Sequence, residues 1–118
     1  MEKESTKNAN EYLFAKSGKQ LKKIFIEDIL FVESMENYVN IFTTSSKEVV
    51  YSTLKLFLES LPGDHFLQVH RSYVVNIKHI HSIEGNMLHV AGHEIPIARN
   101  LREQAFNSII NNRLVLKM

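Results

Sequence analysis

Short apolar-rich segments recur along most of the chain, separated by polar or glycine-containing breaks. Within them apolar and polar residues tend to alternate, which is the period of a half-buried β-strand. The breaks include Ser17-Gly18, Gly85-Asn86 and Ala91-Gly92, and a Gly-Asn pair between two such runs is typical of a hairpin turn. So many short strands at close spacing predict a mostly antiparallel β domain. The predicted strands are Tyr12–Lys16, Leu21–Ile26, Ile29–Glu33, Tyr38–Thr43, Glu48–Tyr51, Phe66–Val69, Tyr73–Ile77, Ile80–Ile83, Met87–Val90 and Glu94–Ile97.

Two stretches have a helical period instead. Leu54, Phe57, Leu58 and Leu61 fall at i, i+3, i+4 and i+7, so they form one apolar stripe. Ser52 is a candidate cap for the start of this helix, and the Pro-Gly pair after Leu61 ends it.

The second helix is predicted over Leu101–Asn111. Its apolar side includes Leu101, Ala105 and Ile109, and Asn100 followed by Glu103 resembles a capping box.

Length and charge limit the class of protein. The chain has 118 residues, enough for one domain with its own core. We assign residues 1–11, which are almost free of apolar side chains, to a linker or disordered tail, and residues 12–118 to the domain. No apolar run is long enough to cross a bilayer. The net charge is only +1, so an interaction with DNA has to depend on where the charges lie.

Catalytic and metal sites find little support. The sequence has no cysteine, no phosphate-binding glycine loop and none of the common hydrolase motifs. His79 and His81 would share a face of a strand, and His89 and His93 flank a turn across which they could approach each other. A metal site needs three or four convergent ligands, and no acidic residue has a suitable spacing. We therefore expect no enzyme activity, no metal and no cofactor.

The stretch "FLQVHRSYVVN", residues 66–76, reads as one strand with a basic pair in its middle. Val74 and Val75 are both apolar, so its later part is expected to be buried on both sides. Arg71 is then either a solvated charge that protects a sheet edge or a group held against an anion.

The stretch "IPIARNLRE", residues 95–103, contains a local conflict. Pro96 cannot donate to a sheet ladder, so it belongs at an edge or a strand end. Arg99 then lies just before a helix N-terminus, where the helix dipole disfavours a cation. A bound phosphate would resolve the conflict, as would a guanine contacted by the guanidinium, but a plain exposed loop arginine is an equal alternative.

The stretch "ESMENYVN", residues 33–40, contains a polar break from Ser34 to Asn37 that predicts a loop. Asn37 and Tyr38 at its end can hydrogen-bond outward, and asparagine can pair with adenine through two hydrogen bonds. A simple loop accounts for the pattern equally well.

Taken together, these stretches resemble the LytTR DNA-binding domain of bacterial response regulators of the LytR/AlgR type. The resemblance rests on four ordered segments and extends from about Tyr12 to Ile110. They are "IEDILFVESMENYVNIFT" (26–43), "STLKLFLESLP" (52–62), "FLQVHRSYVVNIKHI" (66–80) and "EIPIARN" (94–100). The chain departs from many relatives at Gln68, where they carry a basic residue, and at Ser34, where they carry alanine. Gln68 implies one ionic contact fewer and a gentler salt dependence.

The resemblance implies an elongated, mostly β fold made of a stack of antiparallel sheets with one or two short helices. Loops of such domains enter two successive major grooves on one face of double-stranded DNA. His70 and Asn76 are expected to brace this region. The residues implied to contact bases are Asn37, Tyr38, Arg71 and Arg99, and those implied to contact phosphates are Ser72, Asn100 and Arg102.

The resemblance also implies a biological setting. It is a cytoplasmic output domain of a two-component system that regulates transcription, binds paired direct repeats, and forms a homodimer on DNA. A sensor histidine kinase would act only through a receiver domain, for which 118 residues leave no room. We expect either a separately expressed output domain or a stand-alone regulator. The alternative is a β-rich protein-interaction module that adds strands at its exposed edges and does not bind DNA.

Overall fold

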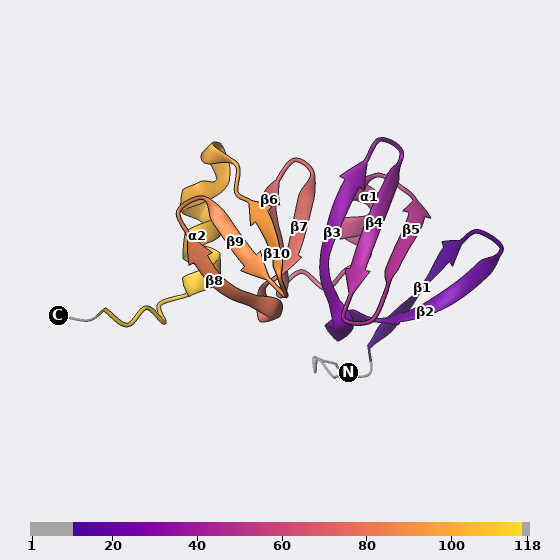
Figure 1. Ribbon diagram of the computed structural model, residues 1–118, viewed down its shortest axis with the longest axis horizontal. Coiled ribbons are helices and arrows are strands. Elements are labelled where there is room, and N and C mark those ends of the chain that lie inside the picture. The colour runs from indigo at the N-terminus through magenta and orange to yellow at the C-terminus, as the bar shows by residue number, and fades with distance from the viewer. Residues whose placement is uncertain (1–10, 117–118) are drawn as a thin grey trace.

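The computed structural model describes residues 11–116, and these residues form a mostly β protein (Figure 1). Every predicted strand is present, with ends that differ by at most two residues. Residues 1–10 of the predicted tail lie outside the described residues. The strands are β1 (Tyr12–Ser17), β2 (Gln20–Phe25), β3 (Ile29–Met35), β4 (Tyr38–Thr43), β5 (Lys47–Tyr51), β6 (Phe66–His70), β7 (Tyr73–Asn76), β8 (Ile80–Glu84), β9 (Met87–Val90) and β10 (His93–Pro96). The helices are α1 (Leu54–Glu59) and α2 (Arg102–Ile110), and the 3-10 turns are η1 (Ile26–Asp28), η2 (Ile77–His79) and η3 (Arg99–Leu101).

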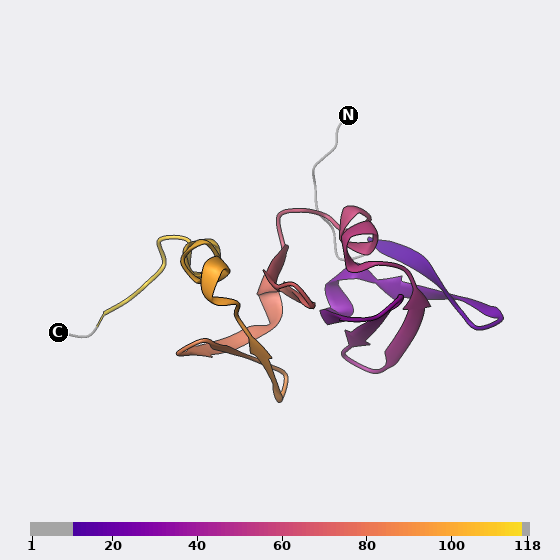
Figure 2. The same cartoon turned by 90° about the horizontal axis from the view of Figure 1, so that it is seen from above.

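The strands form three antiparallel sheets that follow one another along the molecule. The central sheet has the order β5-β4-β3-β7-β6. The β1–β2 hairpin lies beyond one end of it, and the sheet β10-β9-β8 lies beyond the other (Figures 1 and 2). The result measures 55 × 38 × 24 Å, which confirms the predicted elongated stack of antiparallel sheets.

The central strands are buried on both faces. Residues 29–32 of β3 are all buried, as are Val74 and Val75 of β7, as predicted for the latter pair. Since successive side chains on a strand point to opposite faces, each face contributes to a separate core. The core on the α1 side contains Ala15, Ile24, Ile26, Ile29, Val32, Val39, Ile41, Leu54, Phe57, Leu61, Phe66 and Val74. The core on the α2 side contains Leu30, Phe31, Val69, Val75, Leu88, Val90, Ile95, Ile97 and Ala105.

The start of α1 differs from the prediction. Thr53, not Ser52, is the cap, and its hydroxyl accepts a hydrogen bond from the amide of Leu56 at 3.1 Å. Ser52 instead donates its hydroxyl to the carbonyl of Thr53. The two residues are chemically alike, so which one caps depends on where β5 ends.

The start of α2 also differs. The helix predicted over Leu101–Asn111 is present, but α2 is one residue shorter at each end, from Arg102 to Ile110. The capping box of Asn100 and Glu103 does not form, because Asn100 lies inside η3 and Leu101 precedes the helix without a side-chain hydrogen bond. Asn111 follows the helix in the left-handed region with φ 50°, as expected of a helix stop.

Two loop boundaries are corrected as well. The stretch 66–76 is not continuous, as its alternation suggested, but contains the two predicted strands as a hairpin whose turn is Arg71-Ser72, with His70 paired to Tyr73. The polar break at Ser34–Asn37 is shorter than predicted, since β3 continues through Met35 and only Glu36-Asn37 form the turn. Both corrections place the exposed polar residues at tight hairpin ends.

Candidate nucleic-acid interface

Two hairpin turns that are distant in sequence lie side by side at one end of the central sheet. The antiparallel pairing of β3 with β7 places the β3–β4 turn next to the β6–β7 turn, both on the upper side of Figure 1. The amide of Ser34 donates to the carbonyl of Ser72 at 2.8 Å and fixes the two turns to each other.

A third segment reaches the same end of the sheet. After β10 the chain runs past β6, where the amide of Ala98 donates to the carbonyl of Val69 at 2.8 Å. Just before this, the amide of Ile97 donates to the carbonyl of Asn86 at 2.8 Å. These bonds carry η3, and Arg99 with it, to the upper side of Figure 1. We call the three segments, residues 36–37, 71–72 and 99–101, the turn edge.

The β3–β4 turn presents Asn37. The turn is tight because Glu36 adopts φ 56°, in the left-handed region. The carbonyl of Asn37 accepts a hydrogen bond from the amide of Ser52, which leaves its exposed side chain available. Tyr38 begins β4, and its ring packs edge-on against Tyr51 at 5.3 Å, so it lies against the sheet and is 47% exposed.

The β6–β7 turn presents Arg71 and is held by His70. Nδ1 of His70 accepts a hydrogen bond from the amide of Ser72 at 3.0 Å, and the ring stacks edge-on against Tyr73 at 5.6 Å. The amide group of Gln68 also donates to the carbonyl of His70. Arg71 is exposed, and its guanidinium bonds to no other side chain or carbonyl within residues 11–116. His70 therefore holds the backbone of the turn that presents Arg71.

His70→Ala is expected to loosen this turn. The amide of Ser72 loses its acceptor, and one such bond contributes about 0.5–1.5 kcal/mol. The measurement is hydrogen exchange of the Ser72 amide by NMR, which should become faster by roughly 2- to 12-fold. His70→Asn is the matched control, since its side-chain oxygen can accept the same bond and should keep the amide protected. Equal exchange rates in His70→Ala and the wild type would contradict the assignment.

Behind the two turns lies a partly buried polar cluster centred on Glu33. Its carboxylate accepts hydrogen bonds from the side-chain amide of Asn40 at 3.2 Å and from the Tyr73 hydroxyl at 3.0 Å. Asn40 is buried, and its amide also contacts the sulfur of Met35. Burial, followed by the hydrogen bond and the charge of Glu33, raises the pKa of Tyr73 above its ordinary value of 10.0. The Tyr73 hydroxyl therefore stays protonated, and can donate to Glu33, up to a higher pH than an ordinary tyrosine.

This raised pKa has a consequence for stability at high pH. The folded protein keeps a proton on Tyr73 that the unfolded chain releases near pH 10, so the stabilisation is complete below about pH 10 and is lost as pH rises through the folded pKa. The free energy of unfolding of the wild type, measured with urea between about pH 8 and 11, is expected to fall more steeply than that of Tyr73→Phe. Parallel curves for the two proteins would contradict the expectation.

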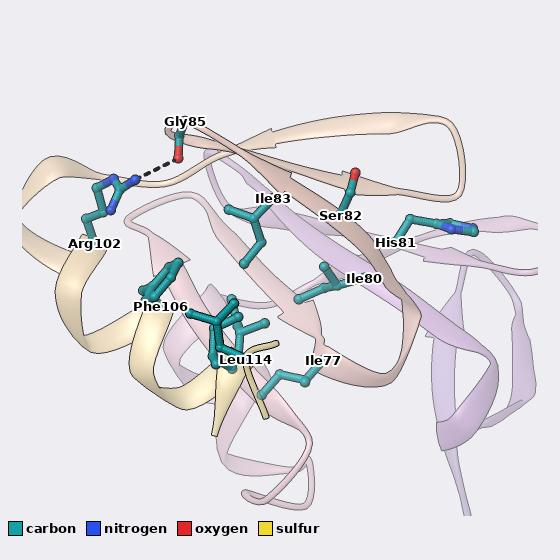
Figure 3. A pocket seen from close by; sticks show the side chains of 11 residues that line it. Ile77, Ile80, His81, Ser82, Ile83, Gly85, Arg102, Phe106 and Leu114 are labelled. Atoms are coloured by element: carbon teal, nitrogen blue, oxygen red, sulfur yellow. Dashed lines mark hydrogen bonds between the residues drawn. The ribbon is translucent and has the colours of Figure 1, made fainter. Parts of the chain in front are cut away.

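Arg102 is tied to the β8–β9 turn. Its Nε donates to the side-chain oxygen of Asn86 at 2.8 Å, and Nη2 donates to the carbonyl of Gly85 at 3.2 Å. Figure 3 shows Arg102 at one end of an apolar groove between β8 and α2, with Phe106 beside it at 5.9 Å from the guanidinium carbon. The groove has a volume of about 470 Å³. Arg102 therefore fastens the start of α2 to the β8–β9 turn.

The structure brings most of the sequence-predicted site residues to the turn edge. Asn37, Arg71, Arg99 and Asn100 are exposed there, with Ser72 half-buried beside them. The guanidinium of Arg99, like that of Arg71, forms no hydrogen bond or ion pair within the described part of the chain. The three other predicted residues are Tyr38, His70 and Arg102, and each already has an internal contact.

Asn76 does not brace the turn edge as predicted, because it pairs with Phe66 at the opposite end of β7 and supports the start of β3 and of η2 instead. It is 1% exposed, donates to the carbonyl of Ile29 at 2.9 Å, and accepts from the amide of Lys78 at 3.0 Å. Sequence reasoning missed the backbone anchors of η3 at Asn86 and Val69. The Gly85-Asn86 pair indicated the β8–β9 turn but not its contact with Arg102.

The histidine pairs do not form. His79 lies in η2, not on a strand with His81, and its Nε2 contacts the carbonyl of Glu27. In the β9–β10 register His89 pairs with Glu94 and His93 with Val90, so His89 and His93 point to opposite faces. Among residues 11–116, no three His, Cys, Asp or Glu side chains gather as a metal site would require. None of the helices in this range is long and apolar enough to cross a membrane.

Comparison with protein families gives one match that covers most of the chain. The model of the LytTr DNA-binding domain matches residues 19–110. Among curated proteins, the sensory transduction protein LytT of Bacillus subtilis is 28% identical over 111 residues, covering 88% of this chain and 46% of that protein. LytT of Bacillus anthracis is 31% identical over 85 residues, covering 67% and 35%. The transcriptional regulatory protein NatR of Bacillus subtilis is 29% identical over 80 residues, covering 68% and 34%. The chain spans less than half the length of these relatives.

Comparison with solved structures supports the fold. The LytTr DNA-binding domain of a methyl-accepting/DNA response regulator from Bacillus cereus superposes with a TM-score of 0.72 at 19% sequence identity. The match covers 84% of this chain and 95% of that one.

Proposed function

Because this chain belongs to the LytTR DNA-binding domain family, we propose that it binds double-stranded DNA with sequence specificity through its turn edge, as the DNA-binding part of a bacterial transcription regulator. The observation that carries the proposal is the meeting of three polar segments, from three separate parts of the sequence, at one end of a rigid sheet. Such a row of exposed donors matches a ligand that is long, polar and anionic.

The roles follow from which side chains are free. Arg71 and Arg99 contact bases in this proposal, because an unengaged guanidinium can donate two hydrogen bonds to guanine. Asn37 can pair with adenine in the same way, and Tyr38 contacts a base next to it. Base reading in the major groove is supported by the protruding turns, which are narrow enough to enter it.

Phosphate contacts fix the register of the protein on the duplex. Ser72 and Asn100 are assigned to this role, since their side chains form no hydrogen bond with another of the described residues. Arg102 is assigned as well, with part of its donor capacity already used by Gly85 and Asn86. One or more N–H groups of its guanidinium remain for a phosphate.

The dimensions fit two successive major grooves. These lie about 34–36 Å apart along one face of the duplex, and the longest dimension of the described protein is 55 Å. A duplex that curves toward the protein would gain contacts, so DNA bending is part of the proposal. A circular-permutation gel-shift assay measures it, and straight DNA would remove this part.

The setting proposed for the chain is that of its relatives. It acts in the cytoplasm, binds paired direct repeats as two copies, and receives its signal from a sensor kinase through a receiver domain. The curated relatives are named as transduction and regulatory proteins and are more than twice as long as the matched part, which leaves room in them for further domains. No catalytic role is part of the proposal.

The test is selection of bound duplexes from a random DNA library, followed by titration of the enriched sequence at two salt concentrations. We expect a short motif, enriched as spaced direct repeats, and an affinity that falls as salt rises. Folded protein that enriches no motif and shows no salt-dependent retention would reject the proposal and favour a protein-interaction module.

A further inference from the structure

The positive charge of this chain is concentrated in the β1–β2 hairpin. Residues 12–25 contain four lysines and no acidic residue, whereas the other residues contain ten Lys and Arg against 13 Asp and Glu. The small net charge of the chain is therefore the sum of a strongly basic hairpin and an acidic rest of the chain. The four lysines are Lys16, Lys19, Lys22 and Lys23.

Two of these lysines maintain the hairpin. Lys22 pairs with the buried carboxylate of Glu48 at 3.1 Å, which ties β2 to β5. The ammonium of Lys23 lies over the ring of Tyr12 at 4.3 Å and that of Phe25 at 5.3 Å. Cation–π and edge-to-face contacts of this kind stiffen the outer face of the ribbon.

The other two lysines have no such role. Lys16 and Lys19 lie at the closed end of the hairpin, on either side of Gly18, and both are exposed. Within residues 11–116 neither has a carboxylate or ring partner. Lysines on an edge ribbon often serve only to keep the protein from aggregating. Whether Lys16 and Lys19 instead contact a ligand bound at the turn edge depends on where they lie relative to it.

That position follows from where the hairpin is anchored. Its open end is fixed at the side of the sheet opposite the turn edge, because Ile26 donates its amide to the carbonyl of Glu11, and the neighbouring Asp28 accepts from the amide of Thr44 after β4. From this anchor six paired residues on each strand extend about 20 Å toward the side of the turns. Figure 1 shows the closed end pointing up and outward, beyond β5, and Figure 2 shows it at the far end of the long axis from α2.

We propose that Lys16 and Lys19, at the closed end of the β1–β2 hairpin, bind backbone phosphates of the duplex outside the segment read by the turn edge. This rests on the proposed function, since the hairpin meets DNA only if the duplex lies along the turn edge. The contact adds affinity on one flank without sequence preference, because phosphates carry no base information.

The test compares K16Q/K19Q with the wild type on the enriched duplex and on variants shortened from either end. The control is K47Q/K78Q, which removes the same charge from exposed lysines near the opposite end of the central sheet. For K16Q/K19Q we expect the slope of log affinity against log salt to become shallower by about 1–2. We also expect hydroxyl-radical protection to be lost on one flank only, with the enriched motif unchanged.

Three outcomes would overturn the inference. One is a slope unchanged from the wild type, the second is the same change in K47Q/K78Q, and the third is full flank protection in K16Q/K19Q. These results leave the proposed function intact, since the wild type still binds its motif. A wild-type protein without any motif would instead reject the proposed function, and the inference with it. Circular dichroism of both double variants verifies the fold.

Discussion

Arg99→Ala is expected to remove much of the sequence preference of the protein for DNA while leaving the fold intact, and Arg71→Ala is expected to do the same at a different base. Both side chains are exposed and free of internal hydrogen bonds within the described residues, so truncation removes nothing from the core. A guanidinium that donates two hydrogen bonds to guanine discriminates against other bases by about 1–3 kcal/mol. Each variant should therefore lose roughly 5- to 150-fold in preference for its motif.

The measurement is the ratio of affinities for the enriched duplex and for a scrambled one, at a single salt concentration. Arg113→Ala is the matched control, since Arg113 is an exposed arginine that follows the C-terminal end of α2, away from the turn edge. It should leave the ratio unchanged. A folded Arg71→Ala/Arg99→Ala protein that keeps the full ratio would refute the assignment of these arginines.

Leu88→Ala is expected to lower the free energy of unfolding by about 2–5 kcal/mol. Leu88 is fully buried in β9, opposite Ile95 of β10, in the core that joins the central sheet to the β8–β10 sheet. Removing its side chain leaves a cavity among residues that cannot collapse freely, since they belong to two sheets and α2. Because the same core supports the chain that leads to η3, Arg99 should lose its fixed position.

Urea titration measures this change, with the slope of the transition used to verify that cooperativity is kept. Leu116→Ala is the control, since Leu116 is 71% exposed and its truncation should alter stability by less than about 0.5 kcal/mol. A loss below about 1 kcal/mol for Leu88→Ala would mean that the two sheets are not joined by a close-packed core.

Local pattern predicted the strands well because each is short, alternating and bounded by turn residues. It separated the strands on either side of Arg71-Ser72 but did not identify these residues as a hairpin turn, since neither adopts a positive φ or belongs to the usual hairpin pairs. Here the turn is set by the His70 side chain and by a register shift between Gln68 and His70, which pattern does not report. The predicted cap of α1 was wrong for a similar reason, because Ser52 and Thr53 have the same capping chemistry and differ only in position.

The candidate site was less predictable than the fold. Arg99 stood out through its conflict with a helix N-terminus. Arg71, Asn37 and Tyr38 were candidates from their own stretches, and the resemblance to a family added Ser72, Asn100 and Arg102. No local pattern could show that Asn37 and Arg71 come together, because the pairing of β3 with β7 joins segments about 40 residues apart. The engagement of Arg102 by Asn86 was likewise hidden, since the two residues meet only through tertiary structure.

The hydrogen bond between Ser34 and Ser72 fixes the distance between the β3–β4 and β6–β7 turns. If the two turns contact bases as proposed, one base pair inserted between those bases shifts the second base by about 3.4 Å and rotates it by roughly 35°. The backbone bond and the two buried cores allow little adjustment, so the protein should not follow such a change. A duplex bound in the proposed way is therefore expected to tolerate base substitutions far better than insertions or deletions between the bases contacted by the two turns.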